Sequence, residues 1–269
     1  MKKNASFKNV VDVLLATFFV SWLFFEIIIL GNKFDIFHYS GLSGKLIVLF
    51  GEVSPLIATY MLLTIWKDIS SAFDYVKTIF QEESILRTSV VLVIFTVLHT
   101  FVAVLGGRDI GHKPAYFIIA IPLAVVSFGL AESAWMGIVY PGVKRVLPAP
   151  LACIAVGFMK GCYFIPMWSI KGTEIRKYEF PYFLIYCVFI NLLLGAIYRM
   201  TESVFACMAF QTVAGTLSIY YGGLMFDRPK ATVLYIAELI VVGAVLLVWK
   251  KMEKVSDDKP LKDEPEVIE

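Results

Sequence analysis

Charged residues are scarce in this sequence. Only 17% of the 269 residues are Asp, Glu, Lys or Arg, and 59% are hydrophobic. A soluble domain is roughly 45–50% apolar and about 25% charged, and the mean hydropathy here is +0.77. The composition excludes an ordinary soluble domain and predicts a polytopic membrane protein. The net charge is +2, and the chain has no basic run suited to nucleic acid, so no nucleic-acid partner is expected.

Histidine and cysteine are also few. The four cysteines (Cys153, Cys162, Cys187 and Cys207) lie in apolar segments and form no C-x-x-C motif. A disulfide framework or a zinc site is therefore not expected, and the thiols are predicted to be small buried hydrophobes. No metal or cofactor is expected. Of the three histidines, only His99 lies in an apolar run, and we expect a hydrogen-bonded interior residue rather than a ligand.

Long apolar runs are what the chain does contain. Because roughly 20 apolar residues cross a bilayer, these runs predict an all-α, polytopic helical bundle of about eight transmembrane helices. The predicted spans are Val10–Leu30, Leu46–Trp66, Thr88–Leu105, Ala115–Gly137, Pro150–Ser169, Phe180–Tyr198, Ser203–Tyr221 and Ala231–Trp249.

Two segments differ from the spans in composition. Residues 67–87 are amphipathic, which predicts a helix at the membrane surface or, as the alternative, a loop helix packed on the bundle. Residues 250–269 are highly charged and are expected to be a disordered cytoplasmic tail. The membrane domain is then residues 1–249.

Several residues inside the spans are polar or break helices. Pro55 can kink its helix because its ring removes a backbone donor. Glu52 and Glu238 could line a proton or ion path, but we favour snorkelling or a bond to a neighbouring helix. Gln211 and Thr212 are expected to form interhelical hydrogen bonds, worth about 0.6 kcal/mol or somewhat more each.

An even number of spans places both termini on one side of the membrane. The basic residues on the side of the N-terminus are Lys2, Lys3, Lys8, Lys67, Lys77, Arg87, Lys144, Arg145, Arg199, Lys250, Lys251 and Lys254. Those on the other side are Lys33, Lys45, Arg108, Lys113, Lys171, Arg176, Lys177, Arg228 and Lys230. This bias favours cytoplasmic termini in a multi-pass plasma-membrane protein.

The stretch from Gly129 to Pro141 carries an ionisable group, Glu132, within an apolar segment. An unpaired carboxylate in hydrocarbon is expensive, so such a residue faces the protein interior and marks a candidate site. The stretch resembles the motif Glu-Glu-x-x-Trp-Arg-Gly-x-x-x-Pro of the CAAX-protease and bacteriocin-processing (CPBP or Abi) family of intramembrane proteases. Glu132, Trp135, Gly137 and Pro141 are in register with that motif.

The resemblance extends from about residue 9 to 249, but the residues that carry the family's chemistry differ. Ala131 stands at the position of the first Glu and Met136 at that of the Arg. In the family's second motif, Phe-x-x-x-His followed by Pro, Phe164 occupies the His position, Lys160 the aromatic one, and Pro166 is retained.

The third motif, His-x-x-x-Asn, is altered in the same way. The segment that precedes this motif in the family resembles residues 198–203, yet Gln211 stands at the His position and Gly215 at the Asn position.

The resemblance implies a hydrolytic mechanism that these residues cannot supply. In the family, Glu and His are thought to activate water, while a second His and an Asn hold the oxyanion. Water activation needs a group that accepts a proton near neutral pH, which Ala131 and Phe164 cannot do. An oxyanion hole needs preorganised donors; Gln211 can donate, but Gly215 has no side chain. The family's catalytic set is therefore not intact.

Three classes of function follow. We favour a non-catalytic pseudoprotease that acts as a membrane binding or regulatory module for a membrane-protein or peptide partner. The first alternative is an active intramembrane glutamic endopeptidase that processes CAAX or leader peptides with other residues, such as Glu132 and Gln211. The second is a bacteriocin self-immunity or small transport protein, although the sequence shows no repeat or matching broken helices.

The residues expected to line the former site are Glu132, Met136, Lys160 and Gln211. With Met136 in the Arg position, one turn from Glu132, the carboxylate has lost its local partner. Lys160 is the basic residue in the middle of a span. We therefore predict that Lys160 pairs with Glu132 across two helices and, together with Phe164, fills the former cavity. A structural ion pair is favoured over a ligand-binding pair.

Overall fold

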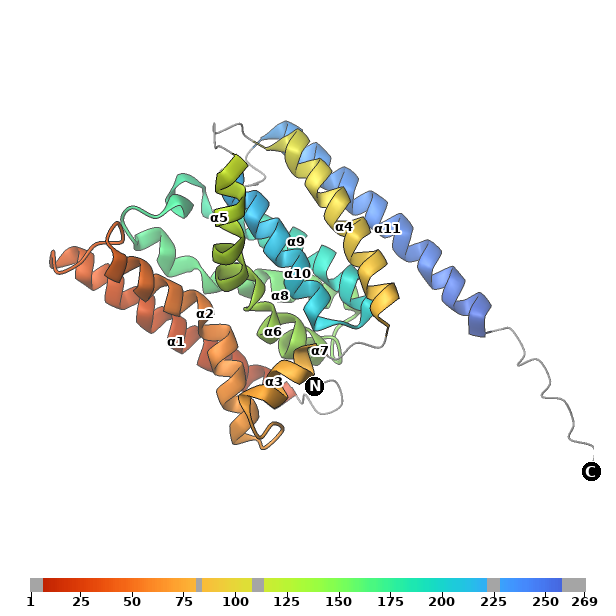
Figure 1. Ribbon diagram of the computed structural model, residues 1–269, viewed down its shortest axis with the longest axis horizontal. Coiled ribbons are helices and arrows are strands. Elements are labelled where there is room, and N and C mark those ends of the chain that lie inside the picture. Colours follow the sequence, from red (N-terminus) through yellow and green to blue (C-terminus); the bar gives the residue numbers. More distant parts are fainter. Residues whose placement is uncertain (1–6, 81–83, 108–113, 222–227, 258–269) are drawn as a thin grey trace, which may run out of the picture.

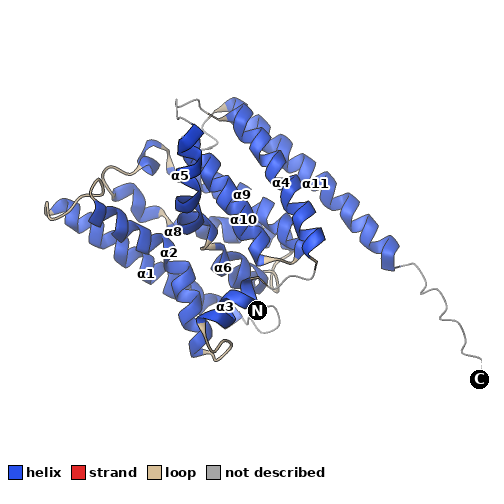
Figure 2. Ribbon diagram, in the orientation of Figure 1, coloured by secondary structure: helices blue, strands red, loops and turns tan. Residues whose placement is uncertain are grey.

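The computed structural model describes residues 7–80, 84–107, 114–221 and 228–257. In these ranges the regular structure is helical throughout (Figure 2), which confirms the predicted all-α class. The elements are α1 (Phe7–Lys33), α2 (Leu42–Ile65), α3 (Ala72–Ile79), α4 (Ile85–Gly106), α5 (Pro114–Ala124), the π-helical turn η1 (Val125–Gly129), α6 (Glu132–Ala134), the π-helical turn η2 (Trp135–Val139), α7 (Tyr140–Val143), α8 (Ala149–Tyr163), the 3₁₀ turns η3 (Ile165–Ser169) and η4 (Glu174–Lys177), α9 (Phe180–Thr201), α10 (Val204–Tyr220) and α11 (Pro229–Asp257).

Seven helical segments are long and apolar enough to cross a bilayer, so the chain is a multi-pass membrane protein. The eighth predicted span is the shorter α10, whose 17 residues extend about 25 Å. Phe205 at its start packs on Phe80, just before α4, and Tyr221 at its end lies against Gly107, just after α4. α10 therefore runs alongside α4 from one end of that span to the other.

The bundle has three parts, visible in Figure 1. α1 and α2 pack together on one side, and α4 and α11 on the other. Between them lie α5 to α7, α8, α9 and α10. α8 and α9 approach closely at Gly157, where an added Cβ would come 2.6 Å from the Cα of Val188. Small residues at such contacts let membrane helices pack tightly.

Both described ends of the chain lie on the same side of the bundle. Val10, near the start of α1, packs on Gly142 at the end of the fourth span. Gly106, at the end of α4, lies beside Ala231 near the start of α11, so the two helices are antiparallel. The last residues of α11 are thus on the side where α4 begins, and Figure 1 places the start of α1 there too.

The structure corrects the predicted end of the fourth span. The predicted span ends at Gly137, before Pro141, but the helical segment continues through Pro141 to Val143. Proline removes the backbone donor to the carbonyl four residues earlier. The chain adapts through the π turn η2, in which the Tyr140 N–H bonds to the Trp135 carbonyl five residues back.

Two further boundaries were wrong. The surface helix predicted over residues 67–87 is the shorter α3, and residues 85–87 already belong to α4. The tail expected to be disordered from Lys250 continues as helix to Asp257, and residues 258–269 lie outside the described ranges. Charge marks where a chain leaves the membrane, but it does not stop a helix.

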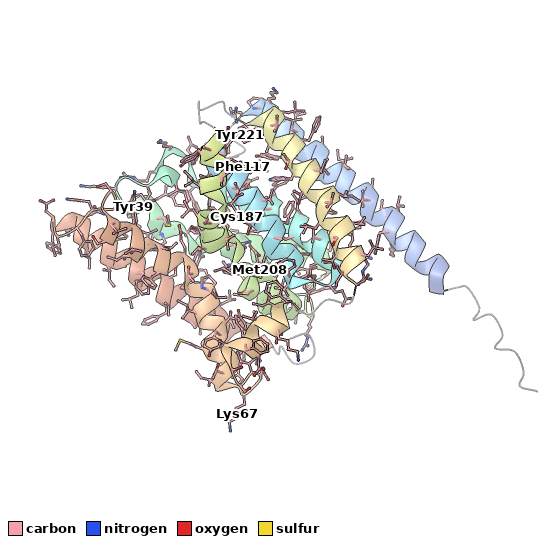
Figure 3. The ribbon with its side chains drawn as sticks, in the orientation of Figure 1. Tyr39, Lys67, Phe117, Cys187, Met208 and Tyr221 are labelled. Atoms are coloured by element: carbon pink, nitrogen blue, oxygen red, sulfur yellow. The ribbon has the colours of Figure 1, made fainter. Side chains whose placement is uncertain are left out.

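α3 is amphipathic, as predicted. Tyr75 and Ile79 are buried against the bundle, while Phe73 and Phe80 are exposed. The Ser71 side chain caps the helix by accepting a bond from the backbone N–H of Asp74. Hydrogen bonds from the Ser70 and Ser71 side chains lower the pKa of Asp74. This end of the molecule carries Lys67, which points away from the bundle in Figure 3.

Candidate functional site

Glu132 lies at a short α-helical turn between two π turns, η1 and η2. Within η1 the Leu130 N–H bonds to the Val125 carbonyl at 2.9 Å, five residues back. π turns interrupt the regular ladder and are frequent at functional sites. The sequence identified Glu132 as unusual, but not the two π turns that present its side chain to the bundle interior, where it is 1% exposed.

Lys160 supplies the cation for this carboxylate. Its Nζ, carried by α8, donates to Oε1 of Glu132, and the Lys160 side chain is 8% exposed. The predicted pairing of these two residues is thereby confirmed. A carboxylate and an ammonium taken out of water stabilise one another only when they are held together, so the contact joins the fourth span to the fifth.

Asn191 of α9 completes a polar cluster that the sequence analysis missed. Its Oδ1 accepts from Lys160 Nζ at 3.4 Å, and its Nδ2 donates to the Cys153 carbonyl at 3.1 Å. The amide is fully buried. One signal was present: an amide near the middle of the apolar segment Phe180–Thr201 needs a partner inside the protein.

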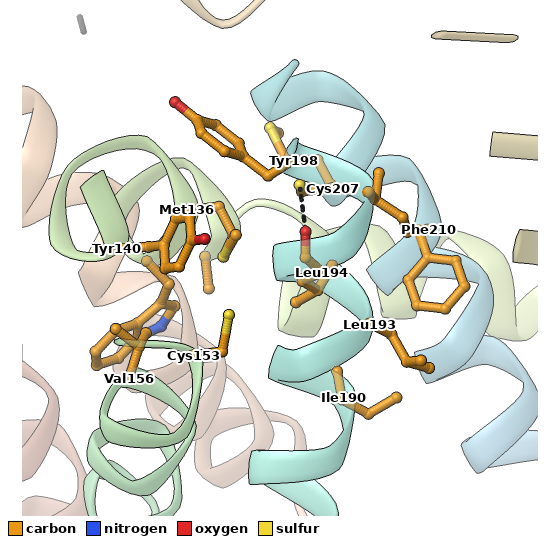
Figure 4. Close-up of a cluster of buried hydrophobic side chains, with 14 of the residues drawn as sticks. Met136, Tyr140, Cys153, Val156, Ile190, Leu193, Leu194, Tyr198, Cys207 and Phe210 are labelled. Atoms are coloured by element: carbon orange, nitrogen blue, oxygen red, sulfur yellow. Dashed lines mark hydrogen bonds between the residues drawn. The ribbon is translucent and has the colours of Figure 1, made fainter. Parts of the chain in front are cut away.

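Two oxygen acceptors of the site lack a hydrogen-bond donor within the described ranges: Oε2 of Glu132 and Oε1 of Gln211. Gln211 is buried on α10, one turn after Cys207. Cys207 itself bonds through Sγ to the Leu194 carbonyl at 3.6 Å (Figure 4). Thr212, predicted to bond between helices, instead donates within α10 to the Met208 carbonyl.

The residues at the family's catalytic positions fall in apolar surroundings. Ala131 is buried beside Glu132. Met136 is fully buried in the apolar cluster that Tyr140 and Cys153 form with α9 (Figure 4). At Gly215 an added Cβ would come 2.3 Å from the ring of Phe128, so that ring occupies the space of a side chain at this position.

Phe164 lies one turn after Lys160, at the C-terminal end of α8. The α-helix ends at Tyr163, and Phe164 follows as its cap. Its ring packs at right angles to Tyr163 and Phe183, with centroids 4.7 and 5.6 Å away.

The remaining sequence predictions for buried polar residues have clear outcomes. Cys153, Cys187 and Cys207 are free and buried, as expected, and Cys162 is half-buried. Cys187 lies inside the bundle in Figure 3. The part of the chain that the structure describes contains no group of three or more His, Cys, Asp or Glu side chains placed to bind a metal ion.

A second buried pair joins α4 to α11. His99 Nδ1 lies 3.1 and 3.2 Å from the two carboxylate oxygens of Glu238. The imidazole packs against Phe189 and Phe210, with ring centroids 6.2 and 5.5 Å away. His99 is thus a hydrogen-bonded interior residue and Glu238 bonds to a neighbouring helix, as predicted for each separately; their partnership was not predicted.

No family model matches this chain, and no curated protein matches it. The likeness to the CPBP family therefore rests on the motif residues of the sequence. The geometry adds a buried polar cluster in which the Glu132 carboxylate is bound to the Lys160 ammonium, and Lys160 is also bonded to Asn191.

Proposed function

We propose that this chain is a non-catalytic relative of the CPBP intramembrane proteases that acts as a binding or regulatory module for a membrane-protein or peptide partner. The observation that supports it best is the contact between Lys160 and Glu132. A general base must reach a water and accept its proton. Here the carboxylate is held by an ammonium and is 1% exposed.

The other positions of the motif support the same proposal. Ala131 and Met136 carry no group that can exchange a proton, and the Phe128 ring fills the space at Gly215. The motif residue Trp135 is nevertheless packed in the core. Motif residues that pack the core but lack reactive side chains are consistent with a protein that binds another molecule in the membrane.

The basic residues favour a cell-membrane protein with cytoplasmic termini. Lys67 and Lys77 lie in the segment between α2 and α4, and Lys144 and Arg145 follow α7, whose Gly142 packs on Val10 at the start of α1. Positive residues prefer the cytoplasmic side of a membrane. In this orientation Glu132 lies toward the cytoplasmic end of its span.

One observation favours an active intramembrane endopeptidase as the second candidate. Oε2 of Glu132 and Oε1 of Gln211 are buried and have no donor among the described residues. Each of these oxygens could accept a hydrogen bond from a water, and the carboxylate of Glu132 could then act as a base. Such a site would need Glu132 to leave Lys160 during turnover.

Turnover by the purified protein in lipid nanodiscs tests the proposal. We expect no cleavage of prenylated CAAX peptides or leader peptides, either by the wild type or by Glu132→Gln. Cleavage that disappears in Glu132→Gln while the protein stays folded would establish the endopeptidase instead. In cells, a Gln211→Ala variant that accumulates to normal abundance should retain the biological role of the protein, because binding does not need an oxyanion donor.

A further inference from the structure

An open cavity of about 490 Å³ lies between the end of α2 and α3. α2 is a membrane span of 24 residues that ends at Ile65, so the cavity lies at the depth of the lipid headgroups. The polar residues that line it are Thr64, Lys67, Asp68, Ser70, Asp74 and Thr78. This is a polar site at the membrane surface, apart from the buried Glu132 cluster.

The three hydroxyl groups of the cavity each donate their hydrogen to the protein. Thr64 Oγ1 donates to the Tyr60 carbonyl at 2.9 Å. Thr78 Oγ1 donates to the Asp74 carbonyl at 2.7 Å, and Ser70 Oγ donates to the Asp74 carboxylate. A hydroxyl has one hydrogen and two lone pairs. Toward a ligand in the cavity, these three groups can therefore only accept hydrogen bonds.

Backbone N–H groups at this turn are also used within the protein. The Lys67 N–H bonds to a carbonyl of the last turn of α2 at 3.1 Å, and the Asp68 N–H bonds to another at 2.9 Å. The Ser70 N–H donates to the Asp74 carboxylate at 3.1 Å. The cavity thus offers hydroxyl and carboxylate oxygens as acceptors, and its charged donor is the Lys67 ammonium.

The opposite charges of Lys67 and Asp68 are both available to a ligand. Both side chains are exposed, and among the described residues no ion pair joins them. A ligand that matches this arrangement carries an ammonium, which donates to Asp68 and the hydroxyl oxygens, and an anionic group within reach of Lys67. A metal ion alone would match it less well, because Lys67 would then face a like charge.

Exposed apolar side chains lead from the cavity into the bilayer. Met61 shares a face of α2 with Thr64 and Ile65, which follow it by three and four residues. Met61 is 55% exposed and Ile65 is 68% exposed. In a membrane span such side chains contact lipid tails. A lipid can therefore lay its tails along this face of α2 while its headgroup enters the cavity.

The geometry points to a site at the turn between α2 and α3 for the headgroup of a phospholipid that carries both a primary ammonium and a phosphate, as phosphatidylethanolamine does. The ammonium donates to the Asp68 carboxylate and to the hydroxyl oxygens around it, and the phosphate accepts from Lys67. A choline headgroup has no N–H and cannot donate to these acceptors. The site does not depend on the function proposed for the Glu132 cluster.

Native mass spectrometry of the full-length protein with phosphatidylethanolamine or phosphatidylcholine of identical acyl chains tests the site. The ethanolamine lipid should bind about tenfold more tightly, because only its ammonium can donate hydrogen bonds to charged acceptors. Asp68→Asn should remove most of this preference. Asp35→Asn, at an 88% exposed aspartate between α1 and α2, is the matched control and should keep it.

Lys67→Gly separates the phosphate contact from the ammonium contact. It should weaken the binding of both lipids alike, because the phosphate is common to them. Lys67 has a φ of 61°, a conformation that Gly adopts without steric cost, so this variant should fold. Melting curves establish that each variant is folded.

The results that would overturn the proposal are specific. They are equal binding of the two lipids by folded wild type, or a preference that survives Asp68→Asn. Tighter binding of phosphatidylglycerol than of phosphatidylethanolamine would assign the turn to an anion at Lys67 instead. Water-soluble phosphoethanolamine in equimolar amount should not displace the lipid, because it has no acyl chains. Displacement would make the soluble compound the ligand and contradict a lipid site.

Discussion

The phenol of Tyr163 donates a hydrogen bond to the backbone carbonyl of Gly51. In a regular helix that carbonyl would accept from residue 55, which is Pro55 and has no N–H. A carbonyl without a donor is costly in the membrane, where water cannot replace the lost bond. Tyr163 of α8 thus satisfies the group that Pro55 frees in α2, and it ties the α1–α2 pair to the rest of the bundle.

Tyr163→Phe should destabilise the protein by about 1–3 kcal/mol, because it leaves a buried carbonyl without a partner. The loss should be smaller in a Pro55→Ala background, since this substitution restores a backbone N–H that can donate to the Gly51 carbonyl. Thermal unfolding of the two single variants and the double variant in nanodiscs measures this coupling. Tyr182→Phe, at a 37% exposed position, is the matched control and should have little effect. Equal losses of stability from Tyr163→Phe in both backgrounds would show that the Tyr163 hydrogen bond does not compensate for the N–H that Pro55 lacks.

The Glu132–Lys160 pair gives a second prediction. Removing one member of a buried pair typically costs about 3–5 kcal/mol because the other charge is left uncompensated. Glu132→Ala and Lys160→Ala should therefore each lower the melting temperature strongly. Glu132→Gln combined with Lys160→Met should recover much of the loss. Glu132→Gln and Lys160→Met as single variants complete a double-mutant cycle with this double variant, and strictly additive effects in it would show that the two side chains do not interact.

Helix positions and this ion pair could be predicted from the sequence for different physical reasons. Runs of apolar residues define the spans because every backbone polar group in lipid must be satisfied within a helix. The pairing of Lys160 with Glu132 followed from charge balance, since few cations are found inside spans. The antiparallel packing of α4 and α11 is non-local, so His99 and Glu238 could be recognised individually but not as partners.

Local departures from helical geometry were the least predictable features. The fourth span was predicted to end at Gly137, but the helix continues past Pro141 because the π turn η2 accommodates the proline. Asn191 carries no charge, so its contact with Lys160 could not be inferred from charge balance.

The His99–Glu238 pair should hold α11 against α4. His99→Ala leaves Glu238 buried without a basic partner and should cost about 3–5 kcal/mol. Replacing both residues with apolar ones, His99→Phe with Glu238→Leu, should be less damaging than the sum of His99→Phe and Glu238→Leu alone. Thermal unfolding of all four proteins measures the coupling. Glu26→Ala, at an exposed position of α1, is the control and should change stability little.

The last prediction concerns the number of crossings. α10 has 17 residues, near the lower limit for a span, yet its ends pack against residues at the two ends of α4. If α10 crosses, the chain has an even number of crossings and the loop around η4 lies on the side opposite the end of α11. Topology reporters inserted after Lys254 and within residues 171–179 should therefore give opposite readings, with the first cytoplasmic. The same reading from both positions would contradict this topology, and a reversed pair would keep the fold but turn it over in the membrane.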